Sequence, residues 1–523
     1  MTNLITNAKK VLKHFVEKSV VKALELKHID IAGLTIDSRS VEQGFLFMAY
    51  PGEETDGRKF IKSAIENGAI LVLAEVKSLE GFAKEFEVLL DDNQQVIAYE
   101  YKAIKIVPVP NLRDKVSQIA GKYYGSPTKK MSLVGVTGTN GKTSICYLAA
   151  QAFEFMQKPT LLLSTLGNGQ IDNLEVTTNT TSDPVTLQAK AAEYLNKACH
   201  HLCMEVSSHG LDQARVSGLN YSIAVFSNLS HDHLEYHGDM ESYFLAKRKL
   251  FIRDEIQTVV INADDLYGQR LLLDEEIIAK KVAYTRNKDL LDKQLVRKIE
   301  GWIESSNEEF TLNGINADLM TPWGTGRINS RLLGDFNLSN LLAVAGILGS
   351  IEGDLNKFLV ALNAAKPVKG RMQQFSCKNA ATFVVDYAHT PDALEKALQT
   401  LNHHCQGDLW CIFGCGGDRD SSKRSMMGMV AEKNAQQIII TDDNPRTEAP
   451  ELIVEMIRDG FSDQTIPYIA SRKAAIENAY ASSTAMDMVL VAGKGHEDYQ
   501  EIGSVKHHYS DIDTVANILE AHS

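Results

Sequence analysis

The segment 132–156 constrains the fold more than any other stretch of this chain. An apolar run, SLVGV, leads into residues 135–143, which read GVTGTNGKT, and a long helical pattern, TSICYLAAQAFEFM, follows. A strand, a glycine-rich turn and a helix in this order are typical of an α/β domain whose turn binds phosphate. Gly138 and Gly141 allow tight backbone geometry, and the start of the helix presents N–H groups to an anion. The segment therefore predicts a phosphate-binding loop.

The polar residues of this loop suit nucleotide chemistry. Lys142 supplies a point charge for phosphate oxygens, and the Thr143 hydroxyl can bind Mg²⁺. The strict pattern GxxxxGK[ST] places a glycine at position 136, where this chain has Val136. This departure makes a GTPase or a motor protein a weaker interpretation, and a purely structural turn stays open as an alternative. We predict that ATP and Mg²⁺ bind at this loop, with ATP contacting Gly138, Thr139, Asn140, Gly141, Lys142, Thr143 and Ser144.

A chain of 523 residues is too long for one ordinary hydrophobic core, which predicts several domains. Pro108 and Pro110 in VPVPNLRDK should interrupt helices and strand ladders, and the strand pattern restarts after Lys366-Pro367. We predict domains at 1–110, 111–366 and 367–523. Alternating strand and helix patterns predict an α/β fold: a smaller N-terminal α/β domain, a central domain with a doubly wound, mostly parallel sheet, and a C-terminal Rossmann-like domain.

Composition and charge argue against several classes of protein. The formal net charge is −13 and no long Lys/Arg run occurs, so we expect no nucleic-acid partner. No stretch of about 18 apolar residues occurs, so we expect no membrane insertion. The N-terminus lacks the apolar core of a signal peptide, and the seven cysteines show no CxxC spacing. We expect reduced thiols in a cytoplasmic monomer.

Four apolar runs after residue 367 each end in a polar loop. They read TFVVDYAH, LWCIFGCGGDRD, QQIIITDDNPR and DMVLVAGKGHE. In a parallel sheet the carboxyl ends of the strands meet at one edge, where α/β proteins bind their ligands. The third loop, DDNPRTEAP at 442–450, combines acids, an amide, a proline and an arginine. This mixture predicts a charged ligand.

Residues 241–251, ESYFLAKRKLF, place a lysine among apolar residues. On a helix, Tyr243, Lys247, Leu250 and Phe251 share one stripe. Burial of a lone ammonium is costly, so a buried Lys247 should be paired or chemically neutralised. The alternative is a lysine whose ammonium reaches water. Nearby carboxylates and imidazoles suit Mg²⁺ binding and charge handling: Glu205 in MEVSSHG, and His231, Asp232, His233 and Glu235 in SNLSHDHLEYHGDM.

The motifs together point to a family. The stretches that carry the resemblance are GTNGKT, NTT at 179–181, MEVSSHGL, DHLEYHGDM, GDFNLSN, GRMQ, VVDYAHTPDAL, GCGGDRD, DNPR and AGKGHEDYQ. They occur in order over most of the chain, and TIDSR at 35–39 extends the match to the first domain. In these stretches the chain resembles the Mur ligases, ATP-dependent amide-bond ligases of bacterial cell-wall (peptidoglycan) synthesis.

The resemblance implies a reaction and assigns one substrate to each domain. The first domain would hold the UDP end of a nucleotide sugar, the second ATP, and the third an incoming amino acid. The resemblance extends to the member that adds meso-2,6-diaminopimelate to UDP-N-acetylmuramoyl-L-alanyl-D-glutamate. ATP would phosphorylate the free carboxylate to give an acyl phosphate. The amine of the amino acid would then attack, pass through a tetrahedral intermediate and expel phosphate.

The resemblance also implies the metal ligands. Thr143 and Glu205 would bind one Mg²⁺, and His233 a second. Lys247 corresponds to a lysine that this family carboxylates with CO₂. The resulting carbamate is an anion that can bind Mg²⁺, whereas an ammonium cannot. The resemblance thus offers an explanation for a lysine on an apolar stripe.

Further site residues follow from matching motif positions. Arg371 in GRMQ corresponds to a phosphate-contacting arginine, and Asn337 and Asp386 correspond to nucleotide-contacting positions. The chemistry suits these roles, since a guanidinium binds phosphate well. The catalytic residues that the resemblance implies are Lys142, His233, Lys247 and Arg371.

For the nucleotide sugar, the resemblance points to residues in both the first and the second domain. The loop Glu53-Glu54-Thr55 departs from the His-Gln-Ala that some relatives carry, which leaves uridine recognition open there. The implied contacts are Ile36, Ser38, Asn179, Thr180, Thr181, Ser207, Gln213 and Arg215.

For the amino acid, the DNPR loop is the implied specificity filter. Arg446 would hold the second carboxylate of diaminopimelate with two parallel hydrogen bonds, and Glu497 would suit its distal ammonium. An ordinary surface pair of Arg446 with Asp442 or Glu448 is the alternative. The residues implied in amino-acid binding are Arg419, Asp443, Asn444, Pro445, Arg446, Gly493 and Glu497.

Other functions remain to be separated by experiment. A lysine-adding ligase or a folylpolyglutamate-type ligase belongs to the same superfamily. A phosphate-loop NTPase that acts as a conformational switch belongs to a different class, as does a catalytically inactive nucleotide-sugar-binding protein. The switch would hydrolyse ATP without an amino acid, whereas the ligase would release phosphate only with both of its other substrates.

Overall fold

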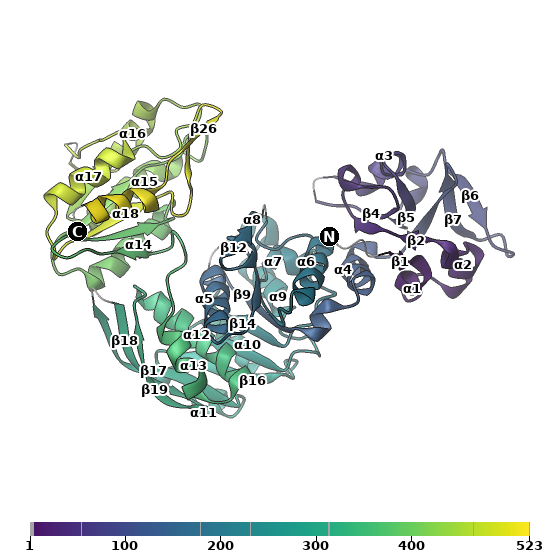
Figure 1. Ribbon diagram of the computed structural model, residues 1–523, viewed down its shortest axis with the longest axis horizontal. Coiled ribbons are helices and arrows are strands. Elements are labelled where there is room, and N and C mark those ends of the chain that lie inside the picture. Colours follow the sequence, from purple (N-terminus) through teal and green to yellow (C-terminus); the bar gives the residue numbers. More distant parts are fainter. Residues whose placement is uncertain are drawn as a thin grey trace. The chain divides into compact units, whose positions relative to one another are not determined.

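The computed structural model describes residues 5–53, 55–177, 179–230, 232–311, 314–463 and 465–521. These residues form two compact units, and Figure 1 labels their elements. The first unit comprises the described residues up to Ala283 together with Leu290–Gly301. The second comprises Tyr284–Asp289 and the described residues from Trp302 onward. The domain boundaries near residues 110 and 366 stay predictions.

The first unit begins with a small mixed sheet of strand order β3-β4-β5-β8-β7-β6. Neighbours from β3 to β8 pair in parallel, and β7 and β6 add antiparallel strands at one edge. Two apolar clusters, built from alternating residues of the strands, cover its two faces. The elements are β3 (Gly33–Thr35), β4 (Phe45–Ala49), α3 (Ile61–Glu66), β5 (Ala69–Glu75), β6 (Glu87–Leu90), β7 (Val96–Tyr101), β8 (Ile104–Val109) and α4 (Leu112–Tyr123).

The expectation that Pro108 interrupts a strand is wrong. Strand β8 runs through Pro108, which pairs with Ala74 of β5. On the other side of β8, pairing with β7 extends only as far as Ile106. Pro108 has no N–H to donate, and it lies where β8 has a single neighbouring strand, so no ladder hydrogen bond is lost.

The centre of the first unit is a mostly parallel sheet, as predicted. Its strand order there is β12-β11-β10-β13-β9-β14-β15-β16. Strands β10, β13, β9, β14 and β15 are parallel to one another, so their carboxyl ends lie at one edge. The main elements are β9 (Ser132–Thr137), α5 (Lys142–Phe155), β10 (Thr160–Ser164), β11 (Gly167–Gln170), β12 (Asn173–Glu175), α6 (Pro184–Asn196), β13 (His201–Glu205), α7 (Ser208–Asp212), β14 (Ile223–Phe226), α8 (Leu234–His237), α9 (Met240–Arg248), β15 (Thr258–Asn262), α10 (Leu266–Leu273) and β16 (Lys280–Thr285).

The second unit contains an antiparallel meander and a Rossmann-like sheet. The four apolar runs predicted after residue 367 form β21 (Thr382–Asp386), β22 (Leu409–Phe413), β23 (Gln437–Ile440) and β24 (Met488–Ala492), which are mutually parallel in the order β21-β24-β22-β23. The remaining main elements are β17 (Gly301–Thr311), β18 (Gly314–Thr321), β19 (Gly324–Ser330), α12 (Asp335–Glu352), α13 (Leu355–Asn363), β20 (Gln373–Phe375), α14 (Pro391–His404), α15 (Ser422–Asn434), α16 (Pro450–Arg458), α17 (Arg472–Ser482), β25 (Tyr499–Ile502), β26 (Val505–His508) and α18 (Asp511–Ala521).

Helices cover both faces of this second sheet, because its strands send alternate side chains to opposite sides. Val384 and Leu490 pack with residues of α14, α15 and α16. Their neighbours Phe383 and Val489 pack with residues of α17 and α18. The loops after the four strands are therefore left at one carboxyl edge, as predicted.

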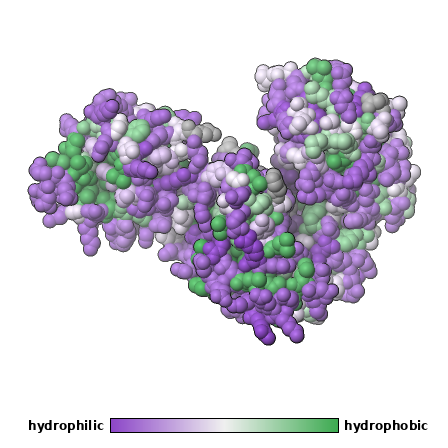
Figure 2. Space-filling model, turned by 180° about the vertical axis from the view of Figure 1, so that it is seen from behind, coloured by the Kyte–Doolittle hydropathy of each residue, from purple (hydrophilic) through white to green (hydrophobic). Residues whose placement is uncertain are grey.

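The surface is mainly hydrophilic on the face that Figure 2 shows, with hydrophobic patches between. Among the described residues, no helix is long and apolar enough to cross a membrane. All seven cysteines lie in the described part of the chain and are free thiols. The cytoplasmic location and the monomeric state stay predictions.

Candidate active site

The glycine loop lies between the carboxyl end of β9 and the start of α5. Gly138 and Gly141 have φ angles of 149° and 84°, a region that side chains rarely adopt. A Cβ atom on Gly138 would lie 1.9 Å from Ser227 Oγ, so only glycine fits there. Gly141 is the N-cap of α5 and offers no side-chain acceptor to the first N–H groups of the helix. These groups can donate to an anion instead.

Asn228, which follows β14, holds this loop from the side. Its carbonyl accepts from the N–H of Thr139 at 2.8 Å, and its side-chain oxygen accepts from the N–H of Asn140 at 3.0 Å. Its side-chain amide also donates to the Asn140 carbonyl at 3.2 Å. The loop conformation is therefore fixed by a residue far away in the sequence.

Lys142 lies over the loop that precedes it. Its Nζ donates to the carbonyls of Gly138 at 2.9 Å and Thr139 at 2.7 Å. Burial lowers the pKa of the Lys142 ammonium, while Glu205 acts in the opposite direction. The cation thus lies within the predicted phosphate loop, as its position in GTNGKT indicates.

Glu205, the last residue of β13, lies beside Thr143. Only 1% of Glu205 is exposed, and its Oε1 accepts from the Thr143 hydroxyl at 2.9 Å and from the Thr165 N–H at 2.8 Å. Burial raises the pKa of the Glu205 carboxyl, and the Lys142 cation opposes this. A hydroxyl and a carboxylate in contact form an oxygen donor set that suits Mg²⁺, which completes its shell with water and phosphate oxygens.

Lys247 is buried together with the apolar residues of its stripe. Its residue exposure is 1%, and Tyr243, Leu250 and Phe251 are equally buried. Its Nζ donates to the Gly138 carbonyl at 2.8 Å, the same carbonyl that accepts from Lys142, and lies 4.6 Å from the Tyr243 ring centroid. Burial lowers the pKa of Lys247 well below its usual range, and repulsion from Lys142 adds to this. The alternative in which the ammonium reaches water is wrong.

His233 is more open than the other predicted metal ligands. Its side chain is 41% exposed, and its ring nitrogens lie 3.5 Å from Asp232 Oδ2 and 3.8 Å from Glu235 Oε1. Its ring centroid lies 5.1 Å from that of His209. No group of three or more His, Cys, Asp or Glu side chains arranged to hold a metal occurs among the described residues. His231 lies outside them.

The predicted nucleotide-sugar residues of the central sheet are connected by hydrogen bonds. The Thr181 hydroxyl donates to the Glu205 carbonyl and accepts from the Ser207 N–H, both at 3.0 Å. The guanidinium of Arg215 donates to the Thr181 carbonyl at 2.9 Å and also to the side chain of Gln213. These four predicted residues, Thr181, Ser207, Gln213 and Arg215, therefore form one polar network.

The other predicted nucleotide-sugar residues lie near this network or apart from it. Thr180 accepts from the Thr165 hydroxyl at 3.4 Å, and the Asn179 carbonyl accepts from Thr177. Ser38 is buried in the first sheet region, where its carbonyl accepts from Asn67, and Ile36 is half-buried there. Neither shares a hydrogen bond with the Thr181 network in the described chain. In the loop of residues 53–55, Glu53 pairs with Arg113 at 2.6 Å, and Glu54 lies outside the described residues.

In the second unit, Asp386 at the end of β21 shapes the GRMQ turn. Its carboxylate accepts from the N–H groups of Met372 at 2.7 Å and Ala388 at 2.9 Å, and burial raises its pKa. The Arg371 guanidinium lies 4.7 Å from the Tyr387 ring centroid. Asn337, in the first turn of α12, donates to the Leu333 carbonyl at 2.7 Å.

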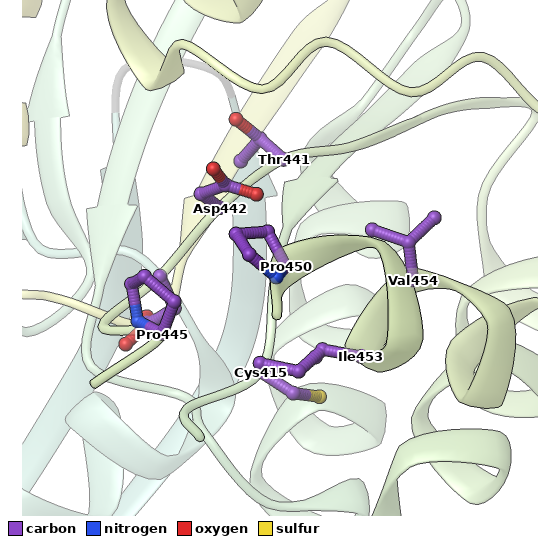
Figure 3. A pocket seen from close by; sticks show the side chains of 8 residues that line it. Cys415, Thr441, Asp442, Pro445, Pro450, Ile453 and Val454 are labelled. Carbon is purple, nitrogen blue, oxygen red and sulfur yellow. The ribbon is translucent and has the colours of Figure 1, made fainter. Parts of the chain in front are cut away.

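The DNPR loop follows β23 at the carboxyl edge of the second sheet. Figure 3 shows a small pocket beside it, with Pro445 on the loop and Ile453 and Val454 on α16. The pocket is lined by Cys415, Thr441, Asp442, Asp443, Pro445, Pro450, Ile453 and Val454. The predicted ligand-binding cations Arg419 and Arg446 are outside this lining.

Asn444 is 3% exposed, and its side chain makes three hydrogen bonds. Its amide donates to Glu497 Oε2 at 3.0 Å, and its oxygen accepts from Lys494 Nζ at 3.0 Å and from the Glu501 N–H at 2.9 Å. Lys494 Nζ also lies 3.0 Å from Glu497 Oε2. Gly493 lies close to the loop, since a Cβ atom on it would lie 2.6 Å from Asp443 Oδ2.

Arg446 has a partner that sequence reasoning missed. Its Nε donates to Glu501 Oε2 at 3.0 Å and its Nη1 to the Gly417 carbonyl at 2.7 Å. Among the described residues it pairs with neither Asp442 nor Glu448, the two partners considered from sequence. Its φ of 50° is unusual for a side-chain-bearing residue.

Arg419 and Glu448 lie on the neighbouring GDRD and DNPR loops. Arg419 is exposed, and in the described chain it makes no hydrogen bond or ion pair. Glu448 pairs instead with the buried Arg424 at 2.8 Å. Arg419 is thus a cation without a partner among the described residues at this edge of the sheet.

These features define a phosphate-loop enzyme of the α/β class. Three family models match the chain in succession: "Mur ligase family, catalytic domain" at residues 30–124, "Mur ligase middle domain" at 136–348, and "Mur ligase, glutamate ligase domain" at 370–495. The chain belongs to the Mur ligase family, whose members are ATP-dependent ligases that form amide bonds.

Three proteins similar to this chain in sequence share the same name. Proteins from Ectopseudomonas mendocina and Pseudomonas aeruginosa are each 43% identical to this chain, over 92% and 94% of it and over 93% and 95% of their own lengths. A protein from Haemophilus ducreyi is 39% identical over 94% of this chain and 96% of its own. Each is called UDP-N-acetylmuramoyl-L-alanyl-D-glutamate–2,6-diaminopimelate ligase.

Solved structures agree in fold. A structure of the same-named ligase superposes with a TM-score of 0.73 and 32% identity, covering 99% of both chains. Mycobacterium tuberculosis folylpolyglutamate synthase, complexed with ADP and AMPPCP, matches at a TM-score of 0.54 and 17% identity, over 73% of this chain and 92% of its own. That second likeness concerns the fold alone.

Proposed function

We propose that this chain joins meso-2,6-diaminopimelate to UDP-N-acetylmuramoyl-L-alanyl-D-glutamate in peptidoglycan precursor synthesis, at the expense of ATP. The observation that carries the choice of amino acid is the DNPR loop. It holds the Arg446 cation and the Glu497 carboxylate on one hydrogen-bonded frame made by Asn444 and Glu501. The distal end of meso-diaminopimelate carries both a carboxylate and an ammonium, so it offers a partner to each of these groups.

The phosphate loop would bind ATP and steady the phosphoryl group during transfer. The N–H groups at the start of α5 and the Lys142 ammonium would face the phosphates, where negative charge develops. The hydrogen bonds that Asn228 accepts from the N–H groups of Thr139 and Asn140 hold the loop in shape for this role. We propose contacts with ATP from Gly138, Thr139, Asn140, Gly141, Lys142, Thr143, Ser144, Asn337 and Asp386, and with its phosphates from Arg371.

The residues of the first unit fit a bound Mg²⁺. Thr143 and Glu205 would hold one Mg²⁺ and His233 a second, and Glu205 would lose its proton when its cation binds. When bound, Mg²⁺ neutralises phosphate charge. The buried Thr143–Glu205 contact supports this assignment, because it brings two oxygen donors next to the phosphate loop.

Lys247 is proposed to carry a carbamate. Lys142 and Lys247 both donate to the Gly138 carbonyl in a buried site, where two ammonium charges repel each other. The lowered pKa of Lys247 favours its uncharged amine. An uncharged amine is the form that reacts with CO₂. A C–N bond forms, one proton leaves to solvent, and the product is an anion. The modification would turn the repulsion between Lys142 and Lys247 into attraction.

The proposed reaction then has two steps. The free carboxylate of the UDP-sugar dipeptide takes the γ-phosphoryl group of ATP, giving an acyl phosphate and ADP. The amine of the amino acid attacks the acyl carbon, and the tetrahedral intermediate expels phosphate as the amide forms. The nucleotide sugar would be held by Ile36, Ser38, Asn179, Thr180, Thr181, Ser207, Gln213 and Arg215, and the amino acid by Arg419, Asp443, Asn444, Pro445, Arg446, Gly493 and Glu497.

A phosphate-release assay with omitted components tests this function. The purified protein is given ATP and Mg²⁺ with the UDP-sugar dipeptide alone, with meso-diaminopimelate alone, and with both. Sustained phosphate release is expected only with both. Equal release without the amino acid would favour an NTPase switch, and preference for L-lysine over meso-diaminopimelate would favour a lysine-adding ligase.

A further inference from the structure

The short hairpin of β25 and β26 lies directly against the DNPR loop. Arg446 forms a parallel bridge with Ile502, its N–H donates to the Glu501 carbonyl at 3.1 Å, and its carbonyl accepts from the Gly503 N–H at 2.7 Å. The Gln500 side chain donates to the Asp443 carbonyl at 2.8 Å. The loop is therefore built onto the hairpin through its backbone.

Glu501 contacts both polar residues of the filter at once. Its N–H donates to Asn444 Oδ1, its carbonyl accepts from the Arg446 N–H, and its carboxylate accepts from Arg446 Nε. The side chains of Arg446 and Glu501 are 20% and 25% exposed. Pairs this shielded from water keep more of their attraction than open surface pairs do.

The contacts of Arg446 leave part of its guanidinium for a ligand. A guanidinium has five N–H donors in one plane. One is used by Glu501 through Nε and one by the Gly417 carbonyl through Nη1. Among the described residues the other three donors, one on Nη1 and two on Nη2, have no partner and can serve an incoming carboxylate.

Two ion pairs of the filter each carry no net charge. Arg446 pairs with Glu501, and Lys494, which is fully buried, pairs with Glu497. A zwitterionic end group adds no net charge to this arrangement. A lysine side chain would add one cation and would offer no carboxylate to Arg446, so the balance would be lost.

We propose that Glu501 is a positioning residue that determines amino-acid specificity: it orients Arg446 through Nε so that the free edge of the guanidinium receives the distal carboxylate of the amino acid. This inference rests on the proposed function. It adds a residue on the β25–β26 hairpin to a filter that the sequence placed only in the DNPR and GKGHE loops. Glu501 acts on the ligand through Arg446.

The test compares full-length variants with meso-diaminopimelate and L-lysine as competing substrates. Glu501→Ala removes the contact with Arg446, and Glu501→Asp shortens the side chain by one methylene but keeps its charge. Loss of one charge-assisted hydrogen bond predicts a rise in the KM for meso-diaminopimelate of roughly 10- to 100-fold for Glu501→Ala, with little change in the KM for ATP. Glu501→Asp should change KM in the same direction, and Glu501→Gln, which keeps an acceptor, should lose less than Glu501→Ala.

Two controls separate positioning from a general effect on folding. Glu477→Gln removes an exposed carboxylate that lies 3.7 Å from Lys473 on α17 and should leave both kinetic constants unchanged. In an Arg446→Ala background, Glu501→Ala should produce no further loss of preference for diaminopimelate over lysine, because its route of action is gone. A purely structural role would instead lower kcat for both amino acids.

The outcomes are distinguishable from failure of the proposed function. If the wild-type protein makes no product with meso-diaminopimelate, the proposed function fails and the inference with it. If the wild type is active but Glu501→Ala and Glu501→Asp both keep the wild-type KM and preference, the proposed function stands and the inference is overturned. Should Glu501→Ala not fold, Glu501→Asp and Glu501→Gln decide alone.

Discussion

Arg446→Ala should damage amino-acid selection while sparing ATP binding. The wild-type side chain is held by Glu501 and by the Gly417 carbonyl, and its free edge can make two hydrogen bonds to a carboxylate. Each charge-assisted hydrogen bond contributes roughly 1.5–3 kcal/mol. Because the side chain is 20% exposed, we take the lower value for each, which gives a loss of about 3 kcal/mol for the pair.

A loss of about 3 kcal/mol corresponds to roughly a 100-fold fall in kcat/KM for meso-diaminopimelate. L-Lysine lacks the distal carboxylate and should lose much less, so the preference between the two should shrink. The assay is coupled phosphate release with each amino acid in turn, and ATP affinity is measured separately by calorimetry. Lys433→Ala, which removes an exposed cation paired with Glu395 in the same unit, is the matched control.

An unchanged preference in Arg446→Ala would refute the filter. A parallel loss with both amino acids would refute it too, because that result indicates damage to the whole site. A loss confined to the affinity for ATP would place Arg446 in a different role.

Three further changes test the ATP and metal side of the site. Lys142→Ala should lower phosphate transfer by more than about 100-fold with the circular dichroism spectrum retained, because charge on the transferring group loses its cation; near-normal turnover would contradict the assignment. Glu205→Gln should raise the Mg²⁺ concentration for half-maximal activity by about 10-fold or more. Since burial raises the pKa of the Glu205 carboxyl, the wild-type Mg²⁺ requirement should also increase as the pH falls through that raised value, and full turnover in excess chelator would sink the metal role. Lys247→Ala should lose activity, with partial rescue by a small carboxylic acid. The lowered pKa of Lys247 predicts CO₂-dependent wild-type activity that is lost as the pH falls through that value, and an unmodified Lys247 in a high-resolution map of active enzyme would count against the carbamate.

Sequence patterns predicted those parts of the site that depend on residues close together in the sequence. The glycine loop follows from a strand, two glycines and a helix start, and the structure places it between β9 and α5. Helical spacing placed Lys247 on the same face as Tyr243, one turn away, but left open whether its ammonium is buried or reaches water. The parallel order of β21 to β24 put the predicted polar loops at one edge.

Contacts between distant segments were beyond sequence reasoning. Asn228 holds the phosphate loop 88 residues before it, and Glu501 reaches Arg446 across 55 residues. Both residues stand in motifs or next to them, but nothing in their spacing shows which loop they meet. Pro108 shows how a local rule can fail. Proline was expected to interrupt the strand, but β7 does not extend alongside Pro108, so no N–H donor is needed on that side of β8.

Competition between amino acids tests the central claim most directly. The wild-type protein is incubated with ATP, Mg²⁺, the UDP-sugar dipeptide and equimolar meso-diaminopimelate and L-lysine, and the products are separated by mass. The proposed function predicts the diaminopimelate-containing UDP-sugar tripeptide as nearly the whole product, with one phosphate released per product. A lysine-containing product in excess, or phosphate release without any amide product, would contradict it.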